Sequence, residues 1–357
     1  MKVAIIGTGF IANTHVAILQ SLGHDVFYVV HKTMEKAVIF AEKWKIPNAT
    51  TDFQAAINHC EVIHICTPPL AHFNYAKEAI LANKHVICEK PLTVNPKEAK
   101  KLHDLANIHK VVAAVNFNVR YHTASASAKA LIAAPTFGKI RMIHGAYLQE
   151  FHAESDFYNW RYQPAIGGKM RATTEIGSHW IDLVRYWTGL EIEAVAANFA
   201  NFQPQRYLTK DGIIHPKAQE NSKLVTIESE DVAIILIKFS NGAIGNLVLS
   251  EVAHGRKNQL QLEVTGTHQS IWWNNEQPYQ LHQGQKGQPS LIHTNPFGGG
   301  FTDTFTELFK AVYQQIAKPS SPQDYPTFED GYINALVCNA IYESAKNGAE
   351  WVTVSMT

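Results

Sequence analysis

Short apolar runs alternate with amphipathic segments over the first 120 residues of this 357-residue chain. Near-continuous apolar runs are typical of parallel strands that are covered on both faces. The pattern therefore predicts an α/β domain over residues 1–120, built on a doubly wound parallel sheet. The expected strands are Lys2–Ile6, Asp25–Val30, Glu61–Cys66, His85–Cys88 and Val111–Val115, and the expected helices are Asn13–Leu22, Met34–Trp44, His72–Ala82 and Pro96–Ile108.

The pattern changes after about residue 120, where longer strands follow one another through short turns. Ser240-Asn241-Gly242 is typical of a hairpin turn. We expect an α+β domain over residues 121–357, on a mostly antiparallel open sheet, with the terminal helix free to pack back on the first domain. The polar segments 201–230 and 277–300 are predicted to be long loops. The expected strands are Ile140–Leu148, Glu193–Phe199, Asp231–Phe239, Ala243–Val252, Gln259–Thr265 and Ser270–Asn274, and the expected helices are Ala124–Ala133, Glu175–Thr188, Phe301–Ile316 and Asp330–Lys346.

Composition narrows the range of partners. Lysine and arginine number 31 and so do aspartate and glutamate, and the cations are scattered, which argues against a nucleic-acid partner or a membrane surface. The longest apolar runs are far short of a membrane span, and the start of the chain leads directly into a strand. The four cysteines form no C-x-x-C pair and are predicted to be reduced, buried thiols. We therefore expect a cytoplasmic protein.

A glycine-rich turn joins the first expected strand to the first helix. In Gly7-Thr8-Gly9-Phe10-Ile11-Ala12, the first glycine allows a tight turn and the second lets the backbone approach a pyrophosphate. This context predicts a dinucleotide-binding Rossmann domain, and a tight turn without a ligand is the alternative. Other residues that follow strands at the same edge are expected to join the site. The predicted cofactor-binding residues are Gly7, Thr8, Gly9, Phe10, Ile11, His31, Lys32, Thr67, Pro68, His72, Glu89 and Lys90.

The end of the second strand bears on the choice between NAD and NADP. A carboxylate at this position normally binds the ribose 2′-hydroxyl of NAD. This chain has His31, followed by Lys32 and Thr33. Because no carboxylate would repel a 2′-phosphate, NADP is favoured over NAD. A solvated Lys32 beside NAD is the alternative.

Glu89-Lys90-Pro91 stands where the fourth expected strand ends. The proline biases Lys90 toward an extended backbone, so this lysine is held on a constrained turn. A lysine there can donate to a substrate oxygen and stabilise developing alkoxide charge. An ordinary surface lysine is the alternative.

The helix expected at Glu175–Thr188 carries a second group of polar residues. At about 100° per residue, Glu175, His179 and Asp182 fall within about 60° of one another, separate from an apolar face. Thr174 is predicted to cap the start and Gly189 to end the helix. A histidine can take a proton near neutral pH, and Glu175 could orient it. The alternatives are a salt-bridge face, or a metal site, for which no further ligands are apparent, so no metal is expected.

Two further segments combine aromatic and polar residues. Asn118 and Arg120 follow the last strand of the first domain, and Trp160 and Arg161 lie in an irregular segment before the histidine. Sugars bind to flat aromatic faces and to hydrogen-bond donors. These four residues and Asp182 are therefore predicted to bind substrate, and packing between domains is the alternative.

Together these motifs resemble the glucose–fructose oxidoreductase/inositol dehydrogenase (Gfo/Idh/MocA) family over essentially the whole chain. The resemblance implies a Rossmann domain, an α+β domain whose open sheet forms a homodimer or homotetramer, and catalysis by Lys90 and His179. The family usually has aspartate where this chain has Glu175, and more commonly aspartate at His31. The motifs are the glycine turn, Thr67-Pro68-Pro69, Glu89-Lys90-Pro91, Gly177-Ser178-His179-Trp180-Ile181-Asp182-Leu183, His254-Gly255-Arg256-Lys257-Asn258 and Pro326-Thr327-Phe328-Glu329-Asp330-Gly331.

The expected activity is reversible oxidation of a secondary alcohol on a sugar or cyclitol, with NADP or NAD as hydride acceptor. His179 would take the hydroxyl proton, Lys90 would stabilise the oxygen, and Glu175 would orient His179 or bind a neighbouring hydroxyl. Three alternatives stay open. They are a non-catalytic NAD(P)-binding sugar sensor, a nicotinamide-dependent glycosidase, and reduction of a keto-sugar as the direction in the cell.

Overall fold

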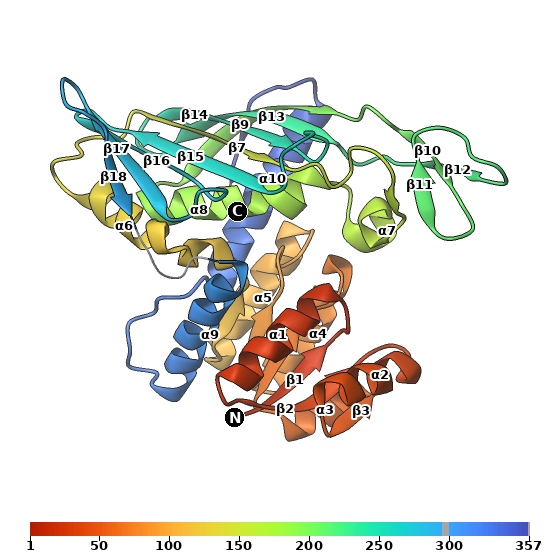
Figure 1. Ribbon diagram of the computed structural model, residues 1–357. Coiled ribbons are helices and arrows are strands. Elements are labelled where there is room, and N and C mark those ends of the chain that lie inside the picture. Colours follow the sequence, from red (N-terminus) through yellow and green to blue (C-terminus); the bar gives the residue numbers. More distant parts are fainter. Residues whose placement is uncertain (295–299, 356–357) are drawn as a thin grey trace. The chain divides into compact units, whose positions relative to one another are not determined.

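The computed structural model describes residues 1–294 and 300–355 (Figure 1). Contacts divide the chain into two compact units, which are treated separately. Unit 1 comprises Met1–Tyr121 and Gly300–Ala335, and unit 2 comprises His122–Gly299 and Leu336–Thr357, apart from the residues that are not described. Residues 300–335, which the sequence pattern placed in the second domain, thus group with the first.

Unit 1 is built on a six-stranded parallel sheet in the order β3-β2-β1-β4-β5-β6, which confirms the doubly wound α/β fold. The short strand β3 and the helix α3 were not predicted, because neither carries a clear hydrophobic period. The strands are β1 (Lys2–Ile6), β2 (Asp25–Val30), β3 (Asn48–Thr50), β4 (Val62–Ile65), β5 (His85–Cys88) and β6 (Ala113–Val115). The helices are α1 (Phe10–Ser21), α2 (Met34–Trp44), α3 (Phe53–His59), η1 (Pro69–Ala71), α4 (His72–Leu81), α5 (Pro96–His109), η2 (Asn118–Tyr121) and α9 (Phe301–Ala317).

Five strands of this sheet end in one register. Ile6 pairs with both Val30 and Ile65, Ile65 pairs with Cys88, and Cys88 pairs with Val115. The residues that follow the strands therefore lie side by side along the carboxyl edge of the sheet. In the order of the strands they are His31, Gly7, Cys66, Glu89 and Asn116.

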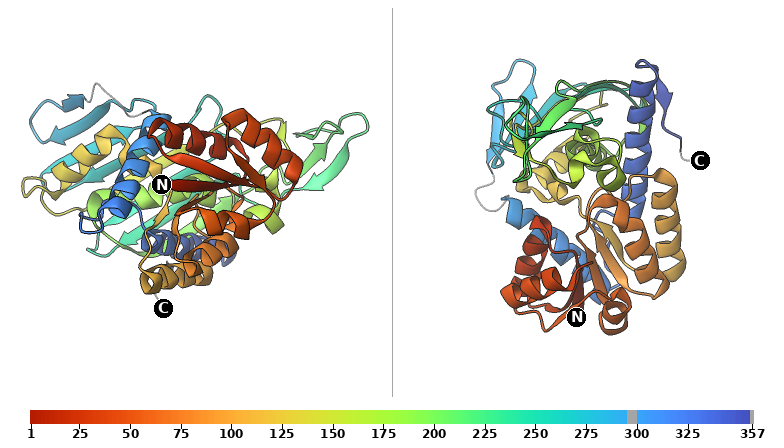
Figure 2. Two further views of the ribbon diagram at one scale, coloured as in Figure 1. Left: turned by 90° about the horizontal axis from the view of Figure 1, so that it is seen from below. Right: turned by 90° about the vertical axis from the view of Figure 1, so that its right-hand side faces the viewer.

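Helices cover both faces of the unit 1 sheet, with α1 and α9 on one face and α4 and α5 on the other (Figure 2). Helix α9 buries Phe305, Leu308, Phe309 and Val312, the spacing of one helical stripe, in the core that also includes Val16 of α1. This stripe explains why residues 300–335 group with the first unit.

Unit 2 is built on a nine-stranded sheet in the order β18-β17-β16-β15-β7-β14-β13-β9-β19. Only the pair β14 and β7 is parallel among the pairings described, which confirms a mostly antiparallel sheet. Helices α6 and α8 lie along one face of it (Figure 1). The strands are β7 (Met142–Leu148), β9 (Ile192–Ala200), β13 (Val232–Phe239), β14 (Ile244–Ser250), β15 (Gln259–Thr265), β16 (Gln269–Asn274), β17 (Gln280–Gln285), β18 (Leu291–Thr294) and β19 (Val352–Thr353). The helices are α6 (Thr123–Ala133), η3 (Trp160–Tyr162), α7 (Pro164–Gly167), the π-helical turn η4 (Thr173–Gly177) and α8 (Ser178–Thr188), and α10 (Phe328–Lys346) runs from unit 1 into unit 2.

The predicted loops at 201–230 and 277–300 were wrong. The first contains β10 (Gln205–Leu208), β11 (Ile213–His215) and β12 (Lys223–Thr226), which form a separate four-stranded sheet with β8 (Asp156–Phe157). The second contains β17 and β18, and its residues 295–299 lie outside the described residues. The strands of the separate four-stranded sheet were missed because their sequence is polar. That sheet has only a small core, formed by Tyr162, Ile214 and Ile227.

Several smaller predictions can be compared with the structure. The hairpin at Ser240-Asn241-Gly242 is confirmed, since Gly242 has φ +82° and its amide donates to Phe239 O at 2.9 Å. The four cysteines are buried free thiols, as predicted. Within the described residues, no helix combines the length and the apolar character required to cross a bilayer.

Candidate active site

The turn after β1 requires glycine at its first position. Gly7 has φ +104°, a conformation that side chains rarely allow, and its amide donates to Val30 O at 2.8 Å. A Cβ atom on Gly7 would lie 2.7 Å from the carbonyl oxygen of Cys66. The tight approach between β1 and β4 therefore makes any larger residue unfavourable at this position.

Gly9 serves a different purpose, because its surroundings are open. A Cβ atom on Gly9 would meet no described atom within 4 Å. Gly9 is the N-cap of α1, and no side chain caps this first turn, while Ala12 is fully buried. Open backbone in front of uncapped helical amides suits a phosphate group. Thr8 and Ile11 are half-buried beside it and Phe10 is 79% exposed, so the residues present fit a dinucleotide.

The end of β2 presents donors and no carboxylate. Nδ1 of His31 accepts from the backbone amide of Thr33 at 3.1 Å, so the ring hydrogen is on Nε2. Burial lowers the pKa of His31, and the charges of Lys36 and Lys32 lower it further. His31 is therefore a neutral donor near pH 7, and Lys32 is exposed beside it.

The loop after β4 is tied to the turn after β5 by His72. The two ring nitrogens of this fully buried histidine lie 2.7 Å from Thr67 O and 2.9 Å from Pro91 O. Burial lowers the pKa of His72 even though both carbonyl groups favour the protonated ring. The described structure thus places His72 as a tie between loops. Thr67 Oγ1 is buried and has no hydrogen-bond partner among the described residues, and Pro68 is half-buried beside it.

Lys90 follows a carboxylate that is buried deeply. Glu89 is 7% exposed and accepts hydrogen bonds from the His15 ring at 2.9 Å, from the Asn116 amide, and from the backbone amide of Lys90 at 3.2 Å. The peptide bond between Lys90 and Pro91 is cis. Glu89, predicted to bind cofactor, is thus placed as an internal support for the Glu-Lys-Pro turn.

Two predicted substrate-binding residues in unit 1 hold the C-terminal part of that unit. The Asn118 amide donates to Thr304 Oγ1 at 2.7 Å, and the Arg120 guanidinium lies 3.0 Å from the Asp330 carboxylate. Both residues belong to η2, next to helix α9. These described contacts lie within unit 1 and not between domains, and substrate binding by Asn118 and Arg120 stays a prediction.

In unit 2, the helix that carries the candidate histidine begins with a π-helical turn, Thr173–Gly177. Glu230 caps this start, accepting from the Arg171 amide at 3.0 Å and the Thr173 amide at 2.7 Å. Thr174 was wrongly predicted as the cap, because its hydroxyl donates to Met170 O at 2.9 Å instead. The predicted C-terminal glycine is confirmed, since Gly189 has φ +65°.

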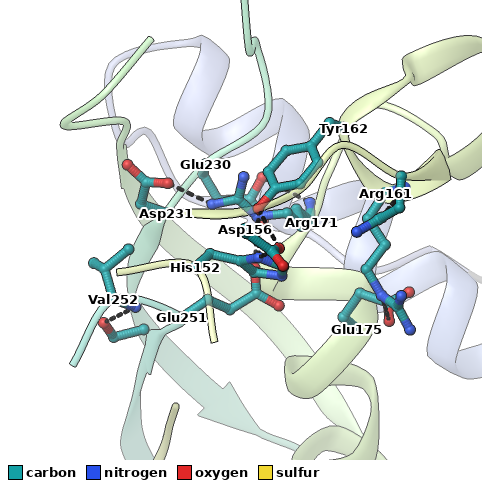
Figure 3. Close-up of polar contacts among 12 residues, drawn as sticks. His152, Asp156, Arg161, Tyr162, Arg171, Glu175, Glu230, Asp231, Glu251 and Val252 are labelled. Atoms are coloured by element: carbon teal, nitrogen blue, oxygen red, sulfur yellow. Dashed lines mark hydrogen bonds and ion pairs between the residues drawn. The ribbon is translucent and has the colours of Figure 1, made fainter. Parts of the chain in front are cut away.

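Glu175 lies on the π-helical turn and pairs with Arg161. Arg161 Nε is 3.0 Å from Glu175 Oε2 (Figure 3). The Arg161 guanidinium also lies 4.4 Å from the centre of the Trp160 ring. Burial opposes the charge of Arg161, but Glu175 outweighs it and the pKa of Arg161 is raised. The structure therefore brings together three of the predicted site residues.

A buried ionic network holds Arg171, which lies just before this turn (Figure 3). The Arg171 side chain is fully buried, and it binds Glu251 at 2.6 Å through Nε and Asp231 through Nη2. Asp231 precedes β13 and Glu251 follows β14, so Arg171 fixes the π-helical turn to the adjacent ends of two strands. Sequence reasoning missed this network, because nothing in the sequence distinguishes these charges from surface ones.

His179 follows the π-helical turn, as the second residue of α8. Its ring centre is 6.4 Å from that of Tyr147 on β7, whose hydroxyl donates to Asn258 at 2.8 Å. Burial raises the pKa of Tyr147. Asp182, predicted to bind substrate, is only 1% exposed. Tyr147 was not predicted, since it is one aromatic residue among several on an alternating strand.

One further cluster in unit 2 was also missed. His152 Nδ1 lies 2.7 Å from the Asp156 carboxylate, which accepts from the Tyr162 hydroxyl at 2.8 Å. Burial opposes ionisation of Asp156, but these two hydrogen bonds lower its pKa. Within the described part of the chain, no three histidine, cysteine, aspartate or glutamate side chains form a group that could hold a metal ion.

Comparison with known proteins identifies the family. Residues 1–117 match the model of the oxidoreductase family, NAD-binding Rossmann fold, and residues 129–354 match that of the oxidoreductase family, C-terminal alpha/beta domain. The chain belongs to the Gfo/Idh/MocA oxidoreductase family. This confirms the resemblance drawn from the motifs and makes the chain an NAD-binding oxidoreductase by family.

Relatives of this Gfo/Idh/MocA protein match it over nearly their whole length. Levoglucosan dehydrogenase of Pseudarthrobacter phenanthrenivorans is 30% identical over 99% of this chain and 98% of its own. Inositol 2-dehydrogenase of an Arthrobacter species is 25% identical over 98% and 94%. A solved levoglucosan dehydrogenase in complex with NADH and L-sorbose has a TM-score of 0.91 at 29% identity, covering 99% of both chains.

Substituting each glycine of the turn separates folding from cofactor binding. Gly9→Ala is expected to leave the midpoint of thermal unfolding unchanged and to weaken cofactor binding by roughly tenfold or more, because its Cβ enters the open space before α1. Gly7→Ala is expected to reduce the free energy of unfolding by about 1–3 kcal/mol. Thermal unfolding and fluorescence titration with reduced cofactor measure both. Unaltered cofactor affinity in Gly9→Ala would rule out phosphate binding at this turn.

Proposed function

We propose that the protein is an NAD(P)-dependent dehydrogenase that oxidises a secondary alcohol of a sugar or cyclitol, or reduces the matching ketone. One observation carries the proposal. The glycine turn, Thr67 and Lys90 follow β1, β4 and β5, which are consecutive in the unit 1 sheet. With neighbouring strands about 4.8 Å apart, the turn and the lysine stand about 10 Å apart along one edge. A dinucleotide bound at that edge has a fixed cation within its length.

The substrate class follows from the relatives and from unit 2. The relatives are named levoglucosan dehydrogenase and inositol 2-dehydrogenase, and one solved relative holds L-sorbose. In unit 2, the half-buried Trp160 ring stacks on the guanidinium of Arg161, which pairs with Glu175. Such a combination of an aromatic face with a fixed donor and acceptor suits a polyhydroxylated ring, which supports a sugar or cyclitol as substrate.

We assign separate roles to the candidate residues. A bound nicotinamide supplies the hydride acceptor or donor. Lys90 stabilises the substrate oxygen as it becomes a carbonyl, and His179 accepts the hydroxyl proton. Glu175, held by Arg161, accepts a hydrogen bond from His179 or from a neighbouring substrate hydroxyl.

A double-mutant cycle tests whether Lys90 and His179 act on one substrate. Lys90→Ala and His179→Ala are each expected to lose about 10²-fold or more in kcat while still binding cofactor. The double variant should lose little more than the worse single variant, because residues that act as a unit are not additive. Turnover is measured with a panel of sugars and cyclitols and both cofactors, from the accumulation of reduced nicotinamide.

Lys100→Ala is the matched control, because this exposed lysine of α5 pairs only with Asp104 among the contacts described. It should retain full activity. Wild-type turnover in Lys90→Ala would refute the proposed reaction. Cleavage of a glycoside without net accumulation of reduced nicotinamide would indicate the glycosidase instead, and binding without turnover would indicate the sensor.

The end of β2 supports NADP as the preferred cofactor. His31 presents a ring N–H, Lys32 contributes an exposed positive charge, and Lys36 lies within electrostatic range of His31. A 2′-phosphate would find donors and positive charge at this position. The ribose 2′-hydroxyl of NAD would lack its usual carboxylate partner.

Reversing the charge of Lys32 tests this preference. Lys32→Glu is expected to lower the ratio of kcat/KM for NADP to that for NAD by about tenfold or more, because the new carboxylate repels the 2′-phosphate. Lys210→Glu, at an exposed turn of unit 2, is the control and should leave the ratio unchanged. A tenfold preference of the wild-type protein for NAD would contradict the assignment.

The nine-stranded sheet supports a homo-oligomer. On β13 the alternate residues Ile234 and Leu236 are 54% and 51% exposed, and Ile244 of β14 is 62% exposed beside its register partner Met142. Their neighbours Ile235 and Ile237 are buried, on the opposite face of the strand. An apolar strand face of this kind in an open sheet suits a second copy of the same chain.

A charged residue on this face should separate the subunits. Leu236→Glu is expected to shift the protein to the monomer, since a carboxylate would be buried without a partner in the interface. Light scattering after size-exclusion chromatography gives the mass. Lys238→Glu, which exchanges one charge for another on the same strand, is the comparison variant. A monomeric wild-type protein would contradict the proposed assembly.

A further inference from the structure

Unit 1 contains a line of four buried polar side chains, three of which have no part in the proposed reaction. They are Tyr313 of α9, His64 of β4, His15 of α1, and Glu89, which follows β5. His15 and His64 are fully buried, and Tyr313 and Glu89 are 5% and 7% exposed. The ring of Phe309 packs at 4.8 Å from His15 and 5.0 Å from His64. Polar groups so enclosed must satisfy one another.

The four side chains form a continuous hydrogen-bonded chain. The Tyr313 hydroxyl lies 3.0 Å from His64 Nε2, and His64 Nδ1 lies 2.9 Å from His15 Nδ1. His15 Nε2 lies 2.9 Å from Glu89 Oε1. Each ring uses both of its nitrogens, so the chain runs without interruption from α9 to the Glu-Lys-Pro turn.

The direction of the bonds follows from the carboxylate. A carboxylate only accepts, so His15 Nε2 must carry a hydrogen. A neutral His15 then accepts at Nδ1, which makes His64 the donor at Nδ1 and Tyr313 the donor to His64 Nε2. A doubly protonated His15 instead donates to His64 Nδ1, and His64 then donates from Nε2 to the Tyr313 hydroxyl, while the bond from His15 to Glu89 is unchanged. In both patterns, an N–H group of His15 points at Glu89.

The chain is one of several factors that act on Glu89. Burial opposes its ionisation, but the hydrogen bond and charge of His15, the Asn116 amide and the charge of Lys90 outweigh burial, so the pKa of Glu89 lies below its ordinary value. Oε2 accepts the backbone amide of Lys90 at 3.2 Å. The ionised carboxylate therefore links the chain directly to the candidate catalytic residue.

Other titratable groups that face Glu89 do not compete for this role. Burial raises the pKa of Cys66 and of Cys88, and it lowers the pKa of His72. All three are uncharged near neutral pH. His24, which stacks on Tyr313 at 3.8 Å, also has a pKa lowered by burial. Besides the neutral amide of Asn116, His15 is thus the described interior side chain that supports the charge of Glu89.

We propose that His15, supported by His64 and Tyr313, is a positioning residue for Lys90. His15 holds Glu89 as a carboxylate, and Glu89 holds the backbone of Lys90 at the start of its turn. This inference rests on the catalytic role proposed for Lys90. The competing explanation is that the same rings serve only as core packing.

Two variants of His15 distinguish positioning from packing. His15→Phe removes the donor but keeps an aromatic ring beside Phe309, and His15→Gln keeps an N–H donor. His15→Phe is expected to lose about 10²-fold in kcat, since small displacements of a catalytic group have such effects, while cofactor affinity stays within about threefold. His15→Gln should recover at least about tenfold of that loss. Wild-type kcat in His15→Phe would overturn the proposal.

The pH dependence of kcat provides a readout that packing would not move. Without the His15 donor, only the Asn116 amide and the charge of Lys90 oppose the effect of burial, so the pKa of Glu89 is expected to rise into the assay range. Activity of His15→Phe should therefore rise with pH through a new ionisation that the wild-type protein lacks. The double variant with Glu89→Gln should lose this ionisation. A uniform loss of kcat at every pH, parallel to a lower melting temperature, would instead show a packing role and sink the proposal.

Spectroscopy of the wild-type protein needs no variant to fold. Nitrogen-15 NMR of the histidine rings should show His15 protonated at Nε2, with an exchange-protected hydrogen that loses its protection on a Glu89→Met substitution, which removes the acceptor. An unprotonated Nε2 would overturn the proposal. Full turnover in Lys90→Ala would refute the proposed reaction while leaving this bond intact. An inactive Lys90→Ala beside a fully active His15→Phe would refute only the positioning role.

Discussion

The common end of five parallel strands in unit 1 constrains everything that follows them. Ladder hydrogen bonds hold Gly7, Cys66 and Glu89 in one row, because each backbone amide donates to the carbonyl oxygen of the last residue of a neighbouring strand. Side chains of a strand alternate between its faces, so a slip of one residue would turn Glu89 away from Asn116. It would also displace Lys90 from the edge that carries the glycine turn. Strand register, more than any single contact, therefore sets the geometry of the candidate cofactor edge.

Both units place ionised groups in their interiors, where an unpaired charge would be costly. In unit 1, Glu89 is balanced by donors from His15 and Asn116. In unit 2, Arg171 is balanced by Asp231 and Glu251. Each network contacts the backbone next to a candidate catalytic residue, Lys90 in unit 1 and Glu175 in unit 2. The hydrogen bonds of both networks are directional. An apolar core could supply comparable stability, but directional bonds also fix the position of the backbone that they hold.

Much of the fold was predictable from the hydrophobic pattern, because many core strands are either apolar over their whole length or alternate apolar and polar residues. Asp25–Val30 and Gln259–Thr265, for example, match the predicted bounds. The strands β10, β11 and β12 were not predictable, since their sheet buries few side chains and the sequence there is polar. The glycine turn and Lys90 were found because their chemistry is local. His15 and His64 were not singled out, because a buried histidine in an apolar segment has no local signature and only the fold shows its partner.

The π-helical turn changes the angle between Glu175 and His179 that the spacing of an ideal α-helix predicts. An ideal α-helix brings residues four apart onto one side, but a π-helical turn closes its bonds over five residues and changes that phase. Glu175 is on the turn and His179 is beyond it, and Glu175 pairs with Arg161. A carboxylate in an ion pair accepts hydrogen bonds well but takes up a proton reluctantly. The ion pair therefore supports the proposed division of roles, in which His179 takes the proton and Glu175 orients its partners.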